Sequence, residues 1–356
     1  MSTQPRRSSV PAPRVVTLTA NPSLDRTLSL PGPLVRGSVV RLAPSSTEPG
    51  GKGVNVARAV AAAGEEVVTV LPAADDDPIV GALQRLRLPM ATVAVPTAVR
   101  TNYTVAEPDG TTTKLNEPGA PLDVRTRAAL ADVLHRYAEG ARWVVLSGSL
   151  PPDTPVDWYA ELVRSLRDTG ARIAVDTSEA PLVALMSAGP DAAPDVLKPN
   201  SEELAQLSGV PEAHLTTDRA AALAAVATLH ERGVAEVLLT LGGDGALLSS
   251  AEGVWSAVPP RIVVRSTVGA GDCSLAGLLL ADLAGAAPAE RLRTAVAYGA
   301  ASASLPGSAV PIPDQVDGAA VEVTTVRTIA ASGTGPTSTT PAPSTTPVPA
   351  AGRDVR

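Results

Sequence analysis

The chain has 356 residues, a formal net charge of −7, 44% apolar residues, 2% aromatic residues and no phenylalanine. Its length suits one large α/β domain or two smaller ones, and alanine, valine and leucine must build the core. The acidic balance and the scarcity of base-stacking aromatics exclude nucleic acid and an anionic membrane surface as expected partners. A single cysteine, Cys273, excludes an internal disulfide. The N-terminus has no signal-peptide pattern, and no apolar run is long enough to span a bilayer. A cytoplasmic protein is therefore expected.

Low-complexity segments flank the chain. Residues 1–13 are rich in Pro and Ser, and residues 326–356 are rich in Ser, Thr and Pro. Neither segment has the apolar side chains that pay for ordering a backbone, so both are predicted to be disordered tails. Residues 14–325 are predicted to form the folded domain.

The first predicted strand covers residues 15–19 and ends shortly before Asp25. Ligands of α/β folds bind beyond the carboxyl ends of parallel strands, so this acid is placed to accept hydrogen bonds from sugar hydroxyls. An aspartate in an ordinary turn is the structural alternative.

A glycine-rich helix start follows. Residues 27–48 alternate polar and apolar side chains, which predicts short exposed strands, and they lead to the motif Gly50-Gly-Lys-Gly-Val-Asn55. Its spacing is not that of a Walker A loop. Glycines that allow close backbone approach, together with Lys52, suit a phosphorylated or polyhydroxylated ligand.

A second ribbon-like stretch follows a strand at 67–71 and a helix at 79–88. Residues 92–118 again alternate and include Arg100, whose guanidinium can grip a phosphate. The stretches 27–48 and 92–118 are predicted to pair into a small β-sheet lid over the site. Such a sheet has an exposed face to cover, so dimerisation through the lid is expected.

Helices and strands alternate from residue 124 onward. Helices are predicted at 124–139, 155–169, 180–187 and 217–232, and strands at 143–147, 173–177, 196–200 and 237–241. This alternation is typical of a parallel sheet with helices on both faces. The motifs fall at the predicted carboxyl ends of strands, where a site is expected.

The last motif is Ser266-Thr-Val-Gly-Ala-Gly-Asp272, which follows strands predicted at 254–258 and 261–265. It precedes helices predicted at 273–285 and 288–304. Gly269, Ala270 and Gly271 let backbone N–H groups converge at a helix N-terminus, which suits an anion. Asp272, expected at the first helical position, is placed to take a proton from a hydroxyl that attacks a phosphoryl group. A helix N-cap after a tight glycine turn is the alternative.

Lysine is rare in this chain. Of 29 basic residues only Lys52, Lys114 and Lys198 are lysine. A compact ammonium and a planar guanidinium do not substitute for each other at a site, so all three are site candidates, against survival by chance on a solvated surface.

Taken together, the motifs resemble the PfkB (ribokinase-like) carbohydrate kinases. Those that carry the resemblance are Asn21-Pro-x-x-Asp25, Gly50-Gly-Lys-Gly-x-Asn55, Lys198-Pro-Asn-x-x-Glu203 and Gly269-Ala-Gly-Asp272. Three more, Arg100-Thr-Asn102, Asn116-Glu-Pro-Gly119 and Ser147-Gly-Ser-Leu-Pro151, indicate the branch of 1-phosphofructokinase and tagatose-6-phosphate kinase. The resemblance runs from about residue 15 to 313.

The resemblance implies a three-layer α/β/α sandwich with a mostly parallel sheet and a β lid, a homodimer, and ATP and Mg²⁺ as cofactors. It implies that Asp272 is the base and that Gly269, Ala270 and Gly271 form the anion hole. The acceptor phosphosugar is expected to contact Asp25, Gly50, Gly51, Lys52, Asn55, Arg100 and Asn102. ATP is expected to contact Lys198, Asn200, Thr240, Gly242, Gly243, Gly245, Tyr298 and Ser302. Glu203 and Asn200 are expected to orient Mg²⁺ through its waters.

The leading hypothesis, implied by the resemblance, is ATP-dependent conversion of fructose 1-phosphate to fructose 1,6-bisphosphate. The positive charge that Lys52 and Arg100 supply favours a phosphosugar over an unphosphorylated sugar as the acceptor. Tagatose 6-phosphate and fructose 6-phosphate are alternative acceptors, and a non-catalytic phosphosugar sensor is a remote one. A nicotinamide-dependent oxidoreductase would need a G-x-G-x-x-G turn after the first strand, where Asn21-Pro-Ser-Leu-Asp25 stands instead. Departures from the family pattern are Cys273 and Lys114, neither of which removes a catalytic group.

Overall fold

A ten-stranded sheet runs through the computed structural model, which describes residues 13–328. Its order is β14-β13-β12-β11-β10-β9-β8-β1-β4-β5, and the seven strands from β11 to β5 are parallel. The parallel strands are β1 (Val15–Leu18), β4 (Val67–Pro72), β5 (Met90–Val93), β8 (Trp143–Ser147), β9 (Arg172–Asp176), β10 (Val196–Leu197) and β11 (Glu236–Thr240). An antiparallel edge is formed by β12 (Ala246–Ser250), β13 (Gly253–Val258) and β14 (Glu322–Thr328).

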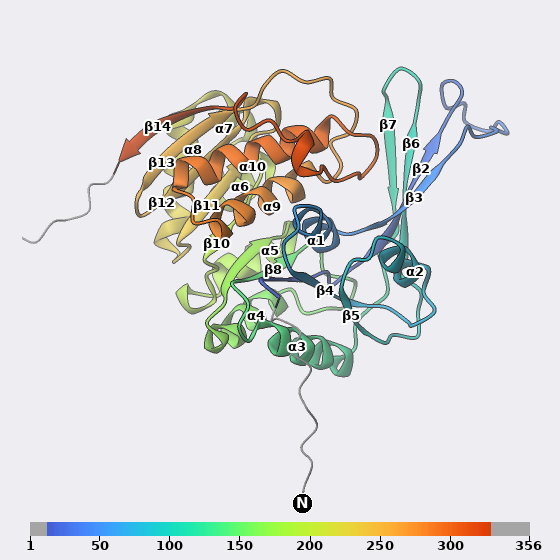
Figure 1. The fold of residues 1–356 in the computed structure, drawn as a ribbon, viewed down its shortest axis with the longest axis horizontal. Helices are drawn as coiled ribbons and strands as arrows, with labels where there is room; N and C mark the ends of the chain where they lie inside the picture. Colours follow the sequence, from blue (N-terminus) through green and yellow to red (C-terminus); the bar gives the residue numbers. More distant parts are fainter. Residues whose placement is uncertain (1–12, 329–356) are drawn as a thin grey trace, which may run out of the picture.

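Helices cover both faces of this sheet (Figure 1). One face packs against α1 (Lys52–Ala62), α2 (Pro78–Arg85), α9 (Ala270–Leu283) and α10 (Pro288–Ala303). The other packs against α3 (Val124–Ala138), α4 (Trp158–Leu166), α5 (Glu179–Ser187), α6 (Ser201–Ser208), α7 (Glu212–Thr217) and α8 (Arg219–Glu231). The expected three-layer sandwich is therefore confirmed.

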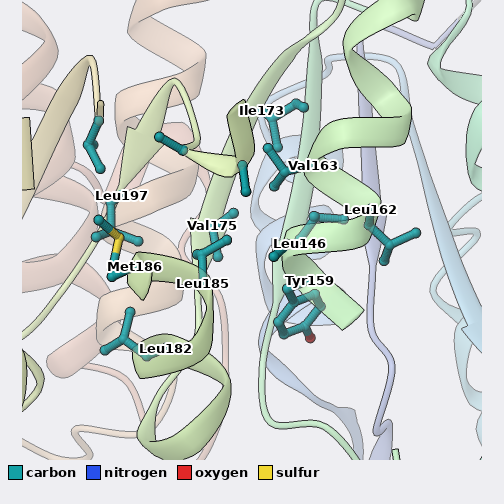
Figure 2. Packing of buried hydrophobic residues seen from close by; sticks show 14 of the residues in the cluster. Leu146, Tyr159, Leu162, Val163, Ile173, Val175, Leu182, Leu185, Met186 and Leu197 are labelled. Atoms are coloured by element: carbon teal, nitrogen blue, oxygen red, sulfur yellow. The ribbon is translucent and has the colours of Figure 1, made fainter. Parts of the chain in front are cut away.

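Aliphatic side chains build the core on both faces, as the absence of phenylalanine requires. Figure 2 shows one part of it, where Val163 of α4 lies beside Ile173 and Leu185 of α5 lies beside Val175, both on β9. Interdigitated leucine and valine side chains exclude water between helix and sheet and thereby stabilise the layers.

A separate four-stranded sheet projects from one end of the molecule and forms the lid (Figure 1). Its strands are β2 (Ser23–Ser29), β3 (Ser46–Gly50), β6 (Arg100–Ala106) and β7 (Thr112–Asn116), in the order β3-β2-β6-β7. Strands β2 and β6 are parallel and the two outer pairs are antiparallel. The two expected lid stretches do pair, although residues 30–45 form a loop and residues 90–93 join the large sheet as β5.

Helix α1 packs closely against β1, at the point where chain from the lid returns to the sandwich. A Cβ on Gly53, the second residue of α1, would lie 2.7 Å from the Leu18 carbonyl oxygen and would also meet Thr19 Oγ1. Only glycine allows this approach of helix to strand. By contrast, Gly81 in α2 has space for a methyl group, with its nearest contact at 3.5 Å.

Several boundaries predicted from the sequence are wrong. Residues 261–265 form no strand, because Pro259 and Pro260 end β13 and leave Val263 exposed. Helix α9 begins at Ala270, so Asp272 is its third residue, not its first. Strand β14 continues to Thr328, past the expected domain end at 325, because it pairs with β13. The remainder of the two expected tails lies outside the described residues.

Short 3-10 helices occur at η1 (Arg167–Thr169), η2 (Pro190–Ala192), η3 (Gly242–Asp244) and η4 (Pro313–Gln315). Across residues 13–328, no helix combines the length and the apolar character needed to cross a membrane.

Candidate active site

A cavity of about 1310 Å³ lies between the lid and the carboxyl ends of the parallel strands. It is lined by residues that follow β1, β8, β9, β10 and β11, by the lid strands, and by the N-terminus of α9. The expected site residues that line it are Asp25, Gly51, Lys52, Asn55, Arg100, Asn102, Lys198, Asn200, Thr240, Gly242, Gly243, Gly245, Gly269, Ala270, Gly271 and Asp272. Segments distant in the sequence therefore meet where the strand ends converge, as expected for an α/β sheet.

The N-terminus of α9 forms the centre of this cavity. Gly269 is its N-cap and has a left-handed backbone with φ of 80°, which glycine adopts without strain. A Cβ on Gly271 would lie 3.4 Å from Lys198 Nζ, so the ammonium stands directly beside the first helical turn. Helix-terminal N–H groups and a lysine together create a strong attraction for an anion.

Asp272 lies beside this anion site and is 6% exposed. Its Oδ2 accepts a hydrogen bond of 2.9 Å from Asn55 Nδ2, while Arg58 Nη1 donates to Asn55 Oδ1 at 3.4 Å and orients that amide. Burial and the neighbouring Asp176 carboxylate raise the pKa of Asp272 to about 6, against the opposing charge of Lys52. A carboxylate with a pKa near neutrality is well suited to act as a general base.

Asp176, at the end of β9, holds two of the three lysines. Its Oδ1 lies 2.8 Å from Lys52 Nζ, and its Oδ2 lies 3.2 Å from Lys198 Nζ. The carboxylate is fully buried, which by itself raises its pKa, but Lys198 and Lys52 hold the pKa below its ordinary value. Asp176 therefore remains charged and fixes the position of both ammonium groups.

Sequence reasoning had missed Asp176. The strand at 173–177 was predicted, and an acid at its carboxyl end is the same signal that pointed to Asp25. Applied uniformly along the chain, that rule would have identified it.

The Lys52 ammonium is paired with carboxylates and is not a free positive charge in the cavity. Its Nζ is 3.8 Å from Glu203 Oε1 in addition to its contact with Asp176. Burial lowers the pKa of Lys52, but Asp176, Glu203 and Asp272 together raise it above its ordinary value. The ammonium is thus permanently charged and lies in the electrostatic surroundings of Asp272.

The lid contributes a polar cluster around Asp25. Asp25 Oδ1 accepts hydrogen bonds from Asn102 Nδ2 at 3.0 Å and from Ser23 Oγ at 2.8 Å. A Cβ on Gly50 would collide with the Asp25 carboxylate, so this position requires glycine although Gly50 does not itself line the cavity. The carboxylate is therefore held in place with acceptor sites remaining for a ligand.

Arg100 is braced by backbone carbonyls. Its Nη1 donates to Glu117 O at 3.0 Å and its Nη2 to Asn21 O at 3.3 Å. Within residues 13–328 its buried Nε has no hydrogen-bond partner. Burial lowers the pKa of Arg100, while Asp25 and Glu117 oppose the shift. Five N–H donors are available on a guanidinium, so several remain for a ligand anion.

Asn200 and Glu203 form the capping box of α6. Asn200 Oδ1 accepts from the Glu203 backbone N at 2.7 Å, and Glu203 Oε2 accepts from the Asn200 backbone N at 2.9 Å. Burial and Asp176 raise the pKa of Glu203. Asn200 lines the cavity and Glu203 does not. Among the residues that the structure describes, no three His, Cys, Asp or Glu side chains gather as a metal site.

Open space marks the η3 turn after Thr240. A Cβ at Gly242 or Gly243 would find no atom within 4 Å, whereas one at Gly245 would meet the Ala257 carbonyl oxygen of the neighbouring strand. The first two glycines thus leave room beside the cavity, and the third is required by the β12–β13 hairpin.

Tyr298 and Ser302 of α10 do not line the cavity. Both are buried, and the cavity is lined instead by Val296, Gly299 and Ala300, with Ala303 one turn later. Adjacent residues on a helix differ by about 100° in direction, so the segment expected beside ATP lines the cavity through neighbours of the two residues named from the sequence.

Known proteins share both the sequence and the architecture. The family model described as pfkB family carbohydrate kinase matches residues 20–315. The 1-phosphofructokinase of Xanthomonas campestris is 37% identical over 292 residues, which cover 79% of this chain and 89% of that protein. The ATP-dependent 6-phosphofructokinase isozyme 2 of Escherichia coli is 33% identical over 292 residues, covering 81% and 92%.

A solved structure is similar over the same region. Phosphofructokinase-2 from Escherichia coli, crystallised with substrates and products, superposes with a TM-score of 0.78 at 30% identity, covering 85% of this chain and 96% of that one.

Proposed function

Because the chain belongs to the pfkB family of carbohydrate kinases, we propose that it transfers a phosphoryl group from ATP to a phosphosugar, with fructose 1-phosphate as the favoured acceptor and fructose 1,6-bisphosphate as the product. One observation carries the proposal. Asp272, with its pKa raised to about 6, stands beside a helix N-terminus and two lysines in a cavity roofed by a polar lid. Base, anion site and acceptor site thus share one space.

Asp272 takes the proton of the attacking sugar hydroxyl as that oxygen bonds to the transferring phosphorus. The bond from that phosphorus to the departing phosphate oxygen breaks, and ADP leaves with the electron pair. The first turn of α9 and Lys198 stabilise the charge on the transferring group. Asn55 orients the Asp272 carboxylate through the 2.9 Å hydrogen bond.

Lys52 is reassigned in this proposal. We expected it at the phosphate already on the acceptor, but its contacts with Asp176 and Glu203 and its charge interaction with Asp272 favour the transferring phosphoryl group. Asp176, which holds both Lys52 and Lys198, acts as a positioning residue for the two ammonium groups.

The nucleotide side of the cavity is assigned to Asn200, Thr240 and the open η3 glycines. Mg²⁺ bound there would neutralise charge on the phosphates. The residues present would hold such an ion through its waters and not by direct ligation. Asn200 faces the cavity, whereas the Asp176 and Glu203 carboxylates are already paired with lysines and, for Glu203, with a backbone amide. Magnesium commonly keeps several waters and takes few protein ligands.

The acceptor side is assigned to the lid. Asp25 and Asn102 hold sugar hydroxyls, and Arg100 supplies positive charge at the base of the lid. A 1-phosphofructokinase and a 6-phosphofructokinase are both among the similar proteins. Tagatose 6-phosphate and fructose 6-phosphate therefore stay as alternative acceptors.

We also propose a homodimer that forms through the lid. The loop joining β2 to β3 exposes four apolar side chains, namely Leu34, Val35, Val39 and Leu42. Exposed apolar groups on a projecting sheet favour burial against a second copy. Light scattering after size exclusion is expected to give a dimer mass, and Val39→Glu is expected to shift it toward the monomer.

The test of the reaction is ADP release with ATP and Mg²⁺, comparing fructose 1-phosphate, fructose 6-phosphate, tagatose 6-phosphate and unphosphorylated fructose. The proposal expects the highest kcat/KM for fructose 1-phosphate. A preference for unphosphorylated fructose would refute a phosphosugar kinase. Binding without turnover for all four would favour the sensor.

A further inference from the structure

Lys114 is the one lysine that the assignments above leave without a role. It lies on lid strand β7 and lines the same cavity as Asp272. Within residues 13–328, Lys52 and Lys198 form ion pairs with Asp176, whereas Lys114 forms none. Its charge is therefore uncompensated and faces the space assigned to the acceptor.

The register of the lid strands places Lys114 relative to its neighbours. Asp25, Asn102 and Asn116 stand side by side on β2, β6 and β7, and all three line the cavity. Lys114 is two residues from Asn116, so it shares the same face one row farther along the strand. One such row is about 7 Å.

Successive rows of the lid lead away from the reacting end of the cavity. The innermost row contains Gly50, which is followed immediately by Gly51 and α1, the helix that carries Asn55 to Asp272. The hydroxyl-binding row of Asp25 comes next, and Lys114 lies in the row beyond it.

A phosphosugar has its phosphate and its reacting hydroxyl at opposite ends. With the hydroxyl at Asp272 and the middle of the sugar at the Asp25 row, the phosphate extends toward the outer row. No acid lies opposite Lys114 in the sheet, since its cross-strand partner is Thr104. An ammonium on a flexible stem is well suited to meet a phosphate there.

We propose that Lys114 is a specificity-determining residue whose ammonium binds the phosphate already carried by the acceptor. This rests on the proposed phosphosugar kinase activity. Arg100 lies in the innermost row, where it pairs with Ser23, and so leaves the outer phosphate position to Lys114.

The test uses Lys114→Met, which removes the charge and keeps the stem, and Lys114→Arg, which retains a charge. Arg26→Met is the matched control, because Arg26 is exposed on the same lid but one residue from Asp25 and hence on the opposite face. For each variant, kcat, KM for fructose 1-phosphate and KM for ATP are measured, with fructose 1-phosphate affinity by calorimetry.

Lys114→Met is expected to raise KM and Kd for fructose 1-phosphate about tenfold, with kcat and the KM for ATP within about twofold of the wild type. Lys114→Arg is expected to recover most of the affinity, and Arg26→Met to leave it unchanged.

Different failures have different meanings. If the wild type phosphorylates the phosphosugar and Lys114→Met binds it equally well, the role of Lys114 is refuted and the proposed function stands. An equal rise in the KM for ATP, or an equal effect of Arg26→Met, likewise refutes it. If the wild type prefers unphosphorylated fructose, the proposed function and the role of Lys114 both fail.

Discussion

Replacing Asp272 by asparagine is expected to stabilise the protein while it abolishes most of the activity. Burial and Asp176 raise the pKa of Asp272 from its ordinary 3.8 to about 6. Between these values the folded protein binds a proton that the unfolded chain has lost, so stability falls as the pH rises through that window and stays reduced above it. Two pKa units correspond to about 3 kcal/mol of unfolding free energy, an upper limit for this carboxylate.

Asparagine retains the shape and the acceptor oxygen for Asn55 Nδ2 but carries no charge. At pH 8, Asp272→Asn is therefore expected to raise the melting temperature of the ligand-free protein by roughly 5 °C, at about 2 °C per kcal/mol. The gain is expected to fall to about half at pH 5 and to about a fifth at pH 4, and to vanish near pH 3, below the ordinary pKa of 3.8, where the folded and unfolded states both bind the proton. Turnover is expected to fall by about 10² to 10⁴-fold.

Calorimetric melts at pH 8, 5 and 4 check this expectation. Glu252→Gln, which removes one carboxylate from an exposed turn, is the control and is expected to change the melting temperature by less than about 1 °C. An Asp272→Asn variant that is no more stable at pH 8, or equally stabilised at every pH, would show that the carboxylate is not destabilised by its surroundings.

Three further outcomes are expected. In steady-state kinetics from pH 5 to 8, kcat/KM should fall about tenfold per pH unit below about 6, because Asp272 must be deprotonated to act as a base; a flat profile down to pH 5 contradicts this. In urea unfolding, Gly53→Ala should destabilise because its methyl group collides with β1, whereas Gly81→Ala should stabilise by about 0.5 to 1 kcal/mol; the reverse order would refute the packing argument. Arg291→Met should lower the free energy of unfolding by about 3 to 5 kcal/mol, because Glu236, now 2.6 Å from Arg291 Nη2, would be left buried and unpaired. Adding Glu236→Leu should recover much of that loss. A single variant as stable as the wild type would argue against a buried ion pair.

The lid shows how much the sequence could predict and where the prediction ended. Alternation in the stretches 27–48 and 92–118 predicted a small sheet, which the structure confirms. Local alternation does not determine which strand pairs with which, so the loop at 30–45 and the assignment of residues 90–93 to the large sheet were missed. The rows that place Lys114 beyond Asp25 exist only once β2, β6 and β7 are in register.

Sequence alone determined the alternation of strands and helices, the presence of two glycine-rich helix starts, near residues 50–53 and 269–271, and the acid at Asp272. These depend on local backbone preferences and on residues a few positions apart. Tertiary structure alone decided that Asp176 joins Lys52 to Lys198 and that Tyr298 faces the core. The first depends on strand ends that meet across more than a hundred residues of chain, and the second on the rotation of α10 against its neighbours. Neither the contacts of Asp176 with the lysines nor the rotation of α10 is encoded in the spacing of nearby residues, since both are set by how the layers pack.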